Sequence, residues 1–353
     1  MNENLLFLLS KFFYYKPVEL RRILEGFKNL EDIRGAPKDA FLKLGAGGKA
    51  LDEFMEKRNA NDAEYHADGT NINIVTIFDK KYPAALKNIY DPPPVLFYKG
   101  DLGCLDEPAL AVIGSRKITE YGRRAADMLV KDLCPYFVIV SGLAYGVDGL
   151  AHEITVANNK KTAAVLGSGL DEASVYPKSN ISLAKKIIDC GGLLLSEIPP
   201  GVGPQKFHFP MRNRIIAGMS RGILIIEGGK KSGTLITAKM GLECGADIFC
   251  VPGSIFNPNS EGVNYLIKCG AHPITSAEDI LEFYGVENKK EKKEYAPKSQ
   301  AEKNILENLG SEGGEMDELA RLTGMAIVDL MGTLTDLEME GAVKNIGGKY
   351  VRV

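Results

Sequence analysis

The chain has 353 residues, more than one ordinary domain holds, so we expect two or three domains. Its formal net charge of −3 argues against bulk attraction to nucleic acids or acidic membranes, but it allows a local basic site. The four histidines lack metal-ligand spacing, the six cysteines form no C-x-x-C pair, and no apolar run reaches the length of a membrane span. We therefore expect a cytoplasmic protein without a metal, a cofactor or a membrane partner.

Residues 1–70 have the pattern of a small helical domain, because apolar residues recur at helical spacing between residues 20 and 27. The polar segment 59–71, rich in Asn, Asp and Gly, then predicts a loop or linker. The proline run of "DPPPVLFYKGDL" (91–102) predicts an extended entry into the next domain.

Residues 71–284 alternate short apolar runs with segments of helical periodicity. Such alternation favours a mostly parallel sheet with helices on both faces, and continuous apolar strands fit a sheet that is buried on both sides. We therefore predict an α/β fold, an extended Rossmann-like, doubly wound sheet with at least six strands. The six runs are "LAVIG", "FVIVSG", "TAAVLG", "GLLLSE", "GILIIEG" and "DIFCVPG".

Residues 285–298 predict a charged, solvated linker, and residues 299–353 predict a small separate domain. Three helical patterns precede "AVKNIGGKYVRV", whose apolar residues around "GG" predict a hairpin, so the outline is that of a winged helix. From residue 296 on, ten acidic residues outnumber six basic ones. Because a winged helix that grips duplex DNA is usually basic, we expect a protein-interaction or weak regulatory module.

In open α/β sheets, ligands bind beyond the carboxyl ends of the strands. The run "LAVI" is followed by Gly114, Ser115, Arg116 and Lys117. Small residues at such a turn free backbone N–H groups to approach an anion, and Arg116 adds a bidentate fork for phosphate. The alternative is a tight turn whose arginine is merely solvated.

The run "GILII" is followed by the glycine-rich, basic loop 227–234, which leads into a helical segment. The loop is not a Walker A motif, because its glycine spacing is wrong. A second phosphate cradle and a flexible basic loop are both compatible with it. The candidate residues are Lys231, Ser232, Gly233 and Thr234.

The segment "KFHFPMRNRIIAGMS" (206–220) lies between two predicted strands on the same rim. Lys206, Arg212 and Arg214 are candidates for phosphate contacts, and Phe207 and Phe209 offer ring faces. Positive charge interleaved with aromatic rings is typical of single-stranded nucleic acid binding. We also expect that one of the two phenylalanines packs into the core instead.

Catalytic machinery is not apparent. The serines after the strands have no histidine at an obvious spacing, and no paired carboxylates suggest a metal role. His152 lies beside apolar Ala151 and Ile154, so we expect a hydrogen-bonded structural histidine.

These motifs together resemble the DNA processing protein A (DprA/Smf) family, over about residues 74–284 and in the family's order. The matching segments are "AVIGSRK", "VSGLAYGVDGLAH", "AVLGSGLDEASVYPKSN", "LLSEIPPG", "FHFPMRNRIIAGMS", "EGGKKSGTLITA", "VPGS" and "EGVNYLIKCGAHPI". Residues 1–70 are loosely similar to the family's helical, SAM-like domain.

The resemblance implies a non-enzymatic protein that binds single-stranded DNA without sequence preference and forms dimers through its Rossmann-like domain. It also implies protection of incoming strands during natural transformation and loading of the RecA recombinase. The DNA-binding residues that the motifs and the resemblance predict are Gly114, Ser115, Arg116, Lys206, Phe209, Arg212, Arg214, Lys231, Ser232, Gly233 and Thr234.

Two other functions stay open at this point. The core is distantly similar to nucleotide phosphoribohydrolases of the lysine-decarboxylase-like kind, which have a P-G-G-x-G-T loop near a catalytic glutamate. Here "EGGKKSGT" replaces that loop, with Glu227 at its start. A nucleotide-sensing regulator with the winged helix as its output is the third possibility.

Overall fold

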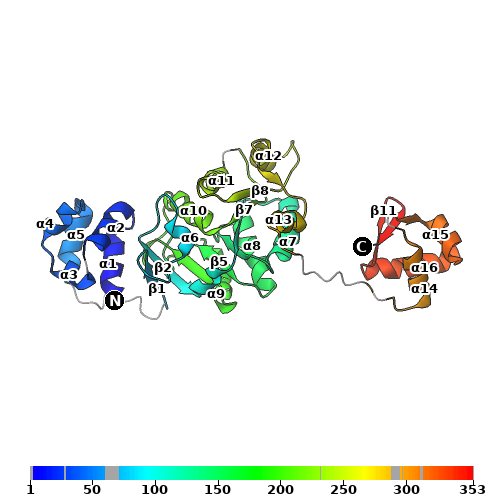
Figure 1. The fold of residues 1–353 in the computed structure, drawn as a ribbon, viewed down its shortest axis with the longest axis horizontal. Coiled ribbons are helices and arrows are strands. Elements are labelled where there is room, and N and C mark those ends of the chain that lie inside the picture. Colours follow the sequence, from blue (N-terminus) through cyan, green and yellow to red (C-terminus); the bar gives the residue numbers. More distant parts are fainter. Residues whose placement is uncertain are drawn as a thin grey trace. The chain divides into compact units, whose positions relative to one another are not determined.

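The computed structural model describes residues 3–27, 29–59, 71–230, 232–287, 295, 297–310 and 313–352. The chain divides into two compact units, residues 1–287 and 288–353 (Figure 1). The first unit contains five N-terminal helices and a nine-stranded sheet, and the second contains a three-stranded sheet. Within the described ranges, no helix is both long enough and apolar enough to span a membrane.

The N-terminal helices share a core with the sheet. The buried rings of Phe13 and Phe41 lie 6.2 and 5.7 Å from that of Phe54, in edge-to-face contacts inside the helical segment. The ring of Phe7 lies 5.8 Å from that of Phe97 in the sheet. The helices are α1 (Glu3–Phe13), α2 (Pro17–Gly26), α3 (Leu30–Gly35), α4 (Lys38–Lys43) and α5 (Lys49–Lys57).

The nine strands have the order β1-β2-β6-β5-β4-β3-β7-β8-β9. All neighbours from β6 to β9 pair in parallel, whereas β1 and β2 are antiparallel additions at one edge. The six predicted runs are β3 to β8, so the mostly parallel, doubly wound sheet is confirmed. The strands are β1 (Asn73–Thr76), β2 (Val95–Gly100), β3 (Ala109–Ile113), β4 (Val138–Ser141), β5 (Thr162–Val165), β6 (Leu193–Ser196), β7 (Gly222–Ile225), β8 (Asp247–Cys250) and β9 (His272–Pro273).

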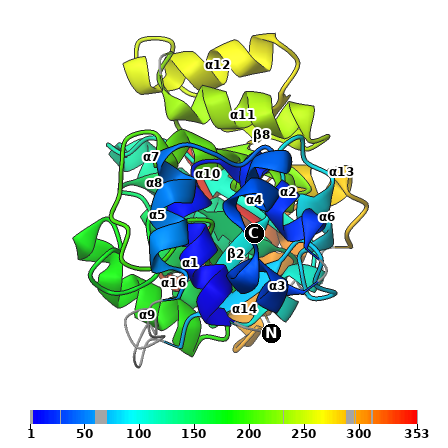
Figure 2. The same ribbon diagram turned by 90° about the vertical axis from the view of Figure 1, so that its left-hand side faces the viewer.

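Helices cover both faces of this sheet, and every residue of β3 to β7 is buried. Helices α6 (Ala84–Lys87), α10 (His208–Met219), α11 (Gly233–Glu243) and α12 (Glu261–Lys268) contribute to the core on one face. Figure 2 shows α11 and α12 next to each other beside β8. The other face packs against the N-terminal helices and against α7 (Glu120–Leu133), α8 (Val147–Ala157), α9 (Ile181–Asp189) and α13 (Ala277–Phe283).

The strand order reverses beside β3, because β4, β5 and β6 follow on one side while β7 and β8 lie on the other. The connections after β3 and β7 therefore leave in opposite directions and open a crevice between them. The strand ends stay joined there, since the Ile226 N–H donates to the Ile113 carbonyl at 3.1 Å. Two of the predicted phosphate cradles, after β3 and after β7, thus begin at the same switch point.

The second unit has the predicted winged-helix outline, with three helices and a terminal hairpin. The hairpin turns at Gly347 and Gly348, whose φ angles of 63° and 95° suit the mirror-image turns that join tightly paired strands. Residues 288–294 and 296, most of the predicted linker, lie outside the described residues. The elements are α14 (Gln300–Asn308), β10 (Gly314–Glu315), α15 (Met316–Thr323), α16 (Ile327–Met339), β11 (Val343–Ile346) and β12 (Lys349–Arg352).

Candidate nucleic-acid interface

A cleft of about 760 Å³ lies at the switch point of the sheet. Its walls come from the turn after β3, the start of α10 and the start of α11, which are far apart in the sequence. Arg214 does not line it, and Lys231 lies outside the described residues. The structure therefore brings together nine of the predicted residues, namely Gly114, Ser115, Arg116, Lys206, Phe209, Arg212, Ser232, Gly233 and Thr234.

The turn after β3 presents two exposed cations on a tightly packed backbone. Gly114 is required because a Cβ atom there would collide with α8 and with the loop after β7. The Ser115 hydroxyl accepts a hydrogen bond from the Lys117 N–H at 3.1 Å and donates to the Lys117 carbonyl at 3.0 Å. Arg116 and Lys117 are exposed and form no ion pair with any residue that the structure describes.

The loop after β7 supplies the N-terminus of α11. The Ser232 side chain caps this helix by accepting from the Thr234 N–H at 3.1 Å. The Thr234 side chain is buried, whereas Gly233 is exposed with open space around its Cα. The positive end of the helix dipole thus faces the cleft with an accessible backbone, as a phosphate cradle requires.

The start of α10 supplies one cation and one ring. Lys206 is exposed and has no acidic partner in the described part of the chain. Phe209 is half-buried, and the Arg116 guanidinium lies 5.1 Å from the centre of its ring, a cation–π contact. Phe207 is half-exposed, contacts the His208 ring at 4.5 Å and does not line the cleft. Phe209, rather than Phe207, therefore faces the cleft.

Arg212 has a different task from the phosphate contact that its motif predicted. Its side chain is buried, and its guanidinium donates to the carbonyl of Gly142 at 2.6 Å and to that of Val165. Burial lowers the pKa of Arg212 to about 10, and the nearby Asp148 acts against that fall. The Asp148 carboxylate accepts from the Gly142 N–H at 3.2 Å, and burial raises its pKa. Arg212 thus ties together the ends of β4 and β5 through these two carbonyls.

Arg214 also departs from its prediction. Its guanidinium donates to the Glu197 carboxylate, whose side chain is only 5% exposed, and its Nε lies 3.6 Å from Asp91. Burial raises the pKa of Glu197, against the effect of Arg214. Arg214 therefore lies in a part-buried ion pair outside the cleft.

Two other candidate residues, His152 and Glu227, are buried and form hydrogen bonds within the fold. His152 is fully buried, its Nδ1 lies 2.7 Å from the Thr162 hydroxyl oxygen, and burial lowers its pKa to about 3. The Glu227 carboxylate is buried and accepts from both the N–H and the hydroxyl of Thr119 at the start of α7. Glu227 is therefore not presented to a nucleotide, as a catalytic glutamate would be.

The structure adds cleft residues that the sequence patterns did not single out. Tyr176 follows β5 and lies 5.8 Å from the Phe209 ring, centre to centre. Asn259 also lines the cleft: its amide donates to the Lys117 carbonyl at 3.2 Å, and its own carbonyl accepts from the Gly228 N–H at 2.7 Å. The "YP" of the motif "VYPKSN" was the available signal for Tyr176, whereas Asn259 had none.

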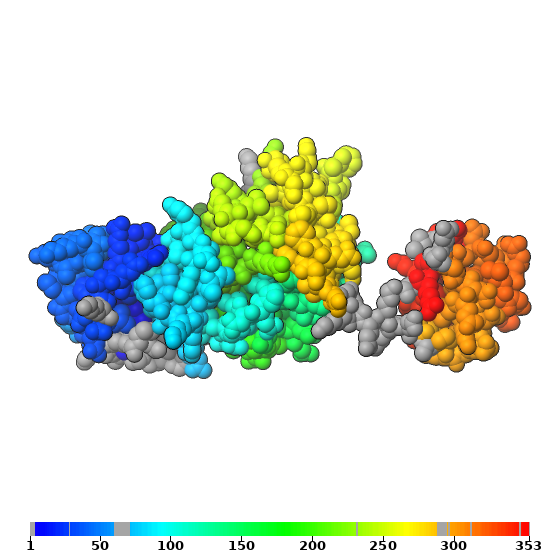
Figure 3. Space-filling view, in the orientation of Figure 1, coloured from blue at the N-terminus to red at the C-terminus, as the bar shows by residue number. Residues whose placement is uncertain are grey.

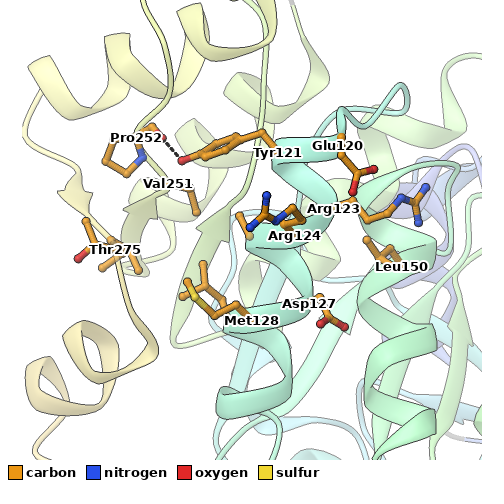
Figure 4. Close-up of a pocket in the computed structure, with 13 residues that line it drawn as sticks. Glu120, Tyr121, Arg123, Arg124, Asp127, Met128, Leu150, Val251, Pro252 and Thr275 are labelled. Carbon is orange, nitrogen blue, oxygen red and sulfur yellow. Dashed lines mark hydrogen bonds between the residues drawn. The ribbon is translucent and has the colours of Figure 1, made fainter. Parts of the chain in front are cut away.

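A second hollow, of about 1000 Å³, straddles α7 (Figure 4). The Tyr121 hydroxyl donates to the Pro252 carbonyl at 2.5 Å on one side of the helix, and Arg123 lies on the other side. None of the predicted residues lines this hollow, and its arginines are balanced by acidic residues, so it offers no net positive charge to a polyanion. The charged residues are Glu120, Arg123, Arg124 and Asp127. Among the described residues, no cluster of His, Cys, Asp and Glu is arranged to hold a metal ion.

Comparison with known sequences gives two domain matches. The sequence model of DNA recombination-mediator protein A matches residues 73–285, and that of the DprA winged helix domain matches residues 289–349. The chain is 43% identical over 243 residues to DNA processing protein DprA of Bacillus subtilis, covering 68% of this chain and 80% of that protein. It is 37% identical over 293 residues to protein Smf of Escherichia coli, covering 80% and 78%.

Comparison with solved structures gives the same family. The X-ray structure of DNA processing protein A from Streptococcus pneumoniae superposes with a TM-score of 0.68 at 37% identity, covering 80% of this chain and 98% of that chain. A structure of the Helicobacter pylori protein, described for its single-stranded DNA binding mode, superposes with a TM-score of 0.55 at 29% identity, covering 61% and 96%.

Proposed function

Since the chain belongs to the DNA processing protein A (DprA/Smf) family, we propose that it binds single-stranded DNA without sequence preference, in the cleft at the switch point. The observation that carries this proposal is the meeting of Arg116 and Lys206, which have no ion-pair partner among the described residues, with the Phe209 ring in one cleft. The Helicobacter pylori relative is described by its single-stranded DNA binding mode, which supports the same ligand class.

Each part of the cleft has a physical task in this proposal. The guanidinium of Arg116 and the ammonium of Lys206 attract the phosphates, and the exposed backbone at Gly233 adds the positive end of a helix dipole. The Phe209 ring stacks on a base, a contact worth about 1–3 kcal/mol that every base can make. Charge and stacking ignore base edges, so the strand is held without sequence readout.

A salt-dependent titration tests this proposal. Fluorescently labelled oligo-dT and a duplex of equal length are titrated with the protein at several salt concentrations. We expect tighter binding of the single strand, and log affinity that falls with log salt by about 0.7 for each phosphate contact. Equal or tighter duplex binding contradicts the proposal.

We further propose that the protein acts in the cytoplasm, protects incoming single strands during natural transformation and loads RecA recombinase onto them. The description of the matched family as a recombination mediator supports this role. Nuclease digestion of oligo-dT with and without the protein measures protection. The lag before RecA hydrolyses ATP on oligo-dT, recorded with and without the protein, measures loading. A lag that the protein does not shorten contradicts the loading role.

Dimerisation through the Rossmann-like domain is the remaining part of the proposal. Large apolar side chains are exposed on α12 and on the loop that precedes it, with Phe256 at 91%, Ile255 at 80% and Tyr265 at 57%. This region protrudes in the space-filling view (Figure 3), and such exposed apolar groups are typical of interaction surfaces. Sedimentation at increasing protein concentration is expected to show a dimer, whereas a monomer at all concentrations contradicts this part.

A further inference from the structure

Two exposed tyrosines extend the line of rings that starts at Phe209. The Tyr176 ring centre lies 5.8 Å from that of Phe209, and the Tyr145 ring centre lies 6.1 Å from that of Tyr176. The exposed fraction is 37% for Tyr176 and 46% for Tyr145. The rings come from three connections, the start of α10, the β5–α9 segment and the β4–α8 loop, all at the carboxyl ends of parallel strands.

The loop that carries Tyr145 is held in a strained conformation beside the basic turn. Leu143 is fully buried with a φ of 54°, a left-handed backbone that costs about 1–2 kcal/mol in a residue with a side chain. The amide of Asn180 donates to the Leu143 carbonyl at 3.0 Å and helps to hold this conformation. Gly146 packs so closely on the backbone of Ser115 that a Cβ atom would collide with its carbonyl. Strained backbone that the surrounding contacts maintain is typical of functional sites.

The exposed tyrosines offer ring surface for bases in addition to that of Phe209. The Arg116 guanidinium lies 5.1 Å from the centre of the Phe209 ring, and a Cβ atom added at Gly167 would press on the same ring. Neither tyrosine hydroxyl forms a hydrogen bond with a described residue, so the rings are not held by their polar ends. Exposed aromatic rings next to exposed cations are the elements of a stacking platform for single strands.

We infer that Tyr176 and Tyr145 stack on successive bases of the bound strand and continue its path from Phe209 over the β4–α8 loop. This inference rests on the proposed function and adds to it the path that the strand follows over the surface. The ring spacings of 5.8 and 6.1 Å exceed the ~3.4 Å rise per nucleotide of a stacked strand. The planes of neighbouring rings are also inclined by 58° and 84°, so bases stacked on them do not form one continuous stack.

The chain contains no tryptophan, so a single introduced indole reports on stacking directly. Tyr145→Trp and Tyr176→Trp are each titrated with oligo-dT while the indole fluorescence is recorded. We expect strong quenching in both variants, because an indole stacked on a base loses its emission. Tyr90→Trp, at a fully exposed position that does not line the cleft, is the matched control and should keep its emission. Saturable binding without quenching at positions 145 and 176 overturns the inference.

A pair of substitutions at position 145 separates stacking from other roles. Tyr145→Leu removes the ring, and we expect the affinity for oligo-dT to fall at least about fivefold, the lower end for the loss of one stacked base. Tyr145→Phe keeps the ring and should bind within twofold of the parent. Equal losses in both variants, or no loss in the leucine variant, contradict the stacking role.

The outcomes also distinguish this inference from the proposed function. If oligo-dT binds with the expected salt dependence but the indoles are not quenched, only the path over the tyrosines fails. If oligo-dT does not bind in preference to duplex, the proposed function fails, and the inference fails with it.

Discussion

Two layers of charge surround the cleft, and they differ in their partners. In the outer layer, Arg116 and Lys206 are exposed and form no ion pair with a described residue. In the inner layer, Arg212 and Arg214 lie further along α10 and donate to buried carbonyls and to a buried carboxylate. A largely buried cation is tolerated only where polar groups replace its water, as two carbonyls do for Arg212 and the Glu197 carboxylate does for Arg214. The outer layer is therefore available to a ligand, whereas the inner layer stabilises the fold.

The largest expected effect is a loss of stability in Arg212→Leu. The change leaves the carbonyls of Gly142 and Val165 without their donor and removes the positive charge that faces buried Asp148. We expect the free energy of unfolding to fall by about 3–5 kcal/mol, measured by urea denaturation. Arg116→Leu is the matched control in the outer layer and should change it by less than about 0.5 kcal/mol. An Arg212→Leu variant that keeps its stability but binds DNA more weakly would show that Arg212 contacts the ligand rather than stabilising the fold.

The second substitution in the inner layer is Arg214→Met, which leaves the Glu197 carboxylate buried without its cation. We expect a loss of about 2–4 kcal/mol in the free energy of unfolding. Adding Glu197→Gln removes the unpaired charge and should recover part of that loss. Strictly additive losses in the double variant would show that the two side chains are not coupled.

The pH dependence of stability tests a further buried group, the imidazole of His152. Its folded-state pKa of about 3 lies below the ordinary value of 6.5, so the unfolded chain takes up the proton first. The contribution of His152 is therefore fully present above pH 6.5 and is lost as the pH falls below it. Between pH 6.5 and 5 the loss amounts to about 2 kcal/mol.

His152→Gln should remove this part of the dependence of the unfolding free energy on pH, measured by urea denaturation at several pH values. His272→Gln, at an exposed position, is the control. A slope that His152→Gln leaves unchanged would show that another group causes the acid sensitivity.

In the outer layer, Arg116→Ala and Lys206→Ala should each lower the affinity for oligo-dT about tenfold on any sequence, with stability unchanged. The physical reason is the loss of one phosphate contact. The slope of log affinity against log salt should therefore become shallower by about 0.7 in each variant. Fluorescence titration at several salt concentrations measures both quantities, and an unchanged slope would remove the residue from the interface.

The smallest effect is expected for Phe207→Ala, because this ring lies outside the cleft and contacts the His208 ring. Its affinity for oligo-dT should stay within twofold of the parent, whereas Phe209→Ala should lose at least about fivefold, as expected for one stacked base. Equal losses in the two variants would place both rings on the strand.

Local patterns predicted much of the fold, for reasons that the structure shows. The runs from β3 to β7 are continuously apolar because both faces of the sheet are covered, and Gly347-Gly348 allow the positive φ angles of the terminal hairpin. The antiparallel strands β1 and β2 were not predicted as a pair, because their pattern is brief and partly polar. The cleft was predicted as a set of strand ends, since ligands of parallel sheets gather there.

The sequence determined the residue types at the rim, namely glycines that permit tight turns, cations and aromatic rings. It did not determine which cations are free, because the roles of Arg116 and Arg212 depend on carbonyls and carboxylates that distant segments bring to them. The tertiary structure buries Arg212, pairs Arg214 with Glu197 and places the rings of Tyr145 and Tyr176 in line with that of Phe209. The physical reason is that burial and pairing depend on neighbours in space, whereas a motif records only neighbours along the chain.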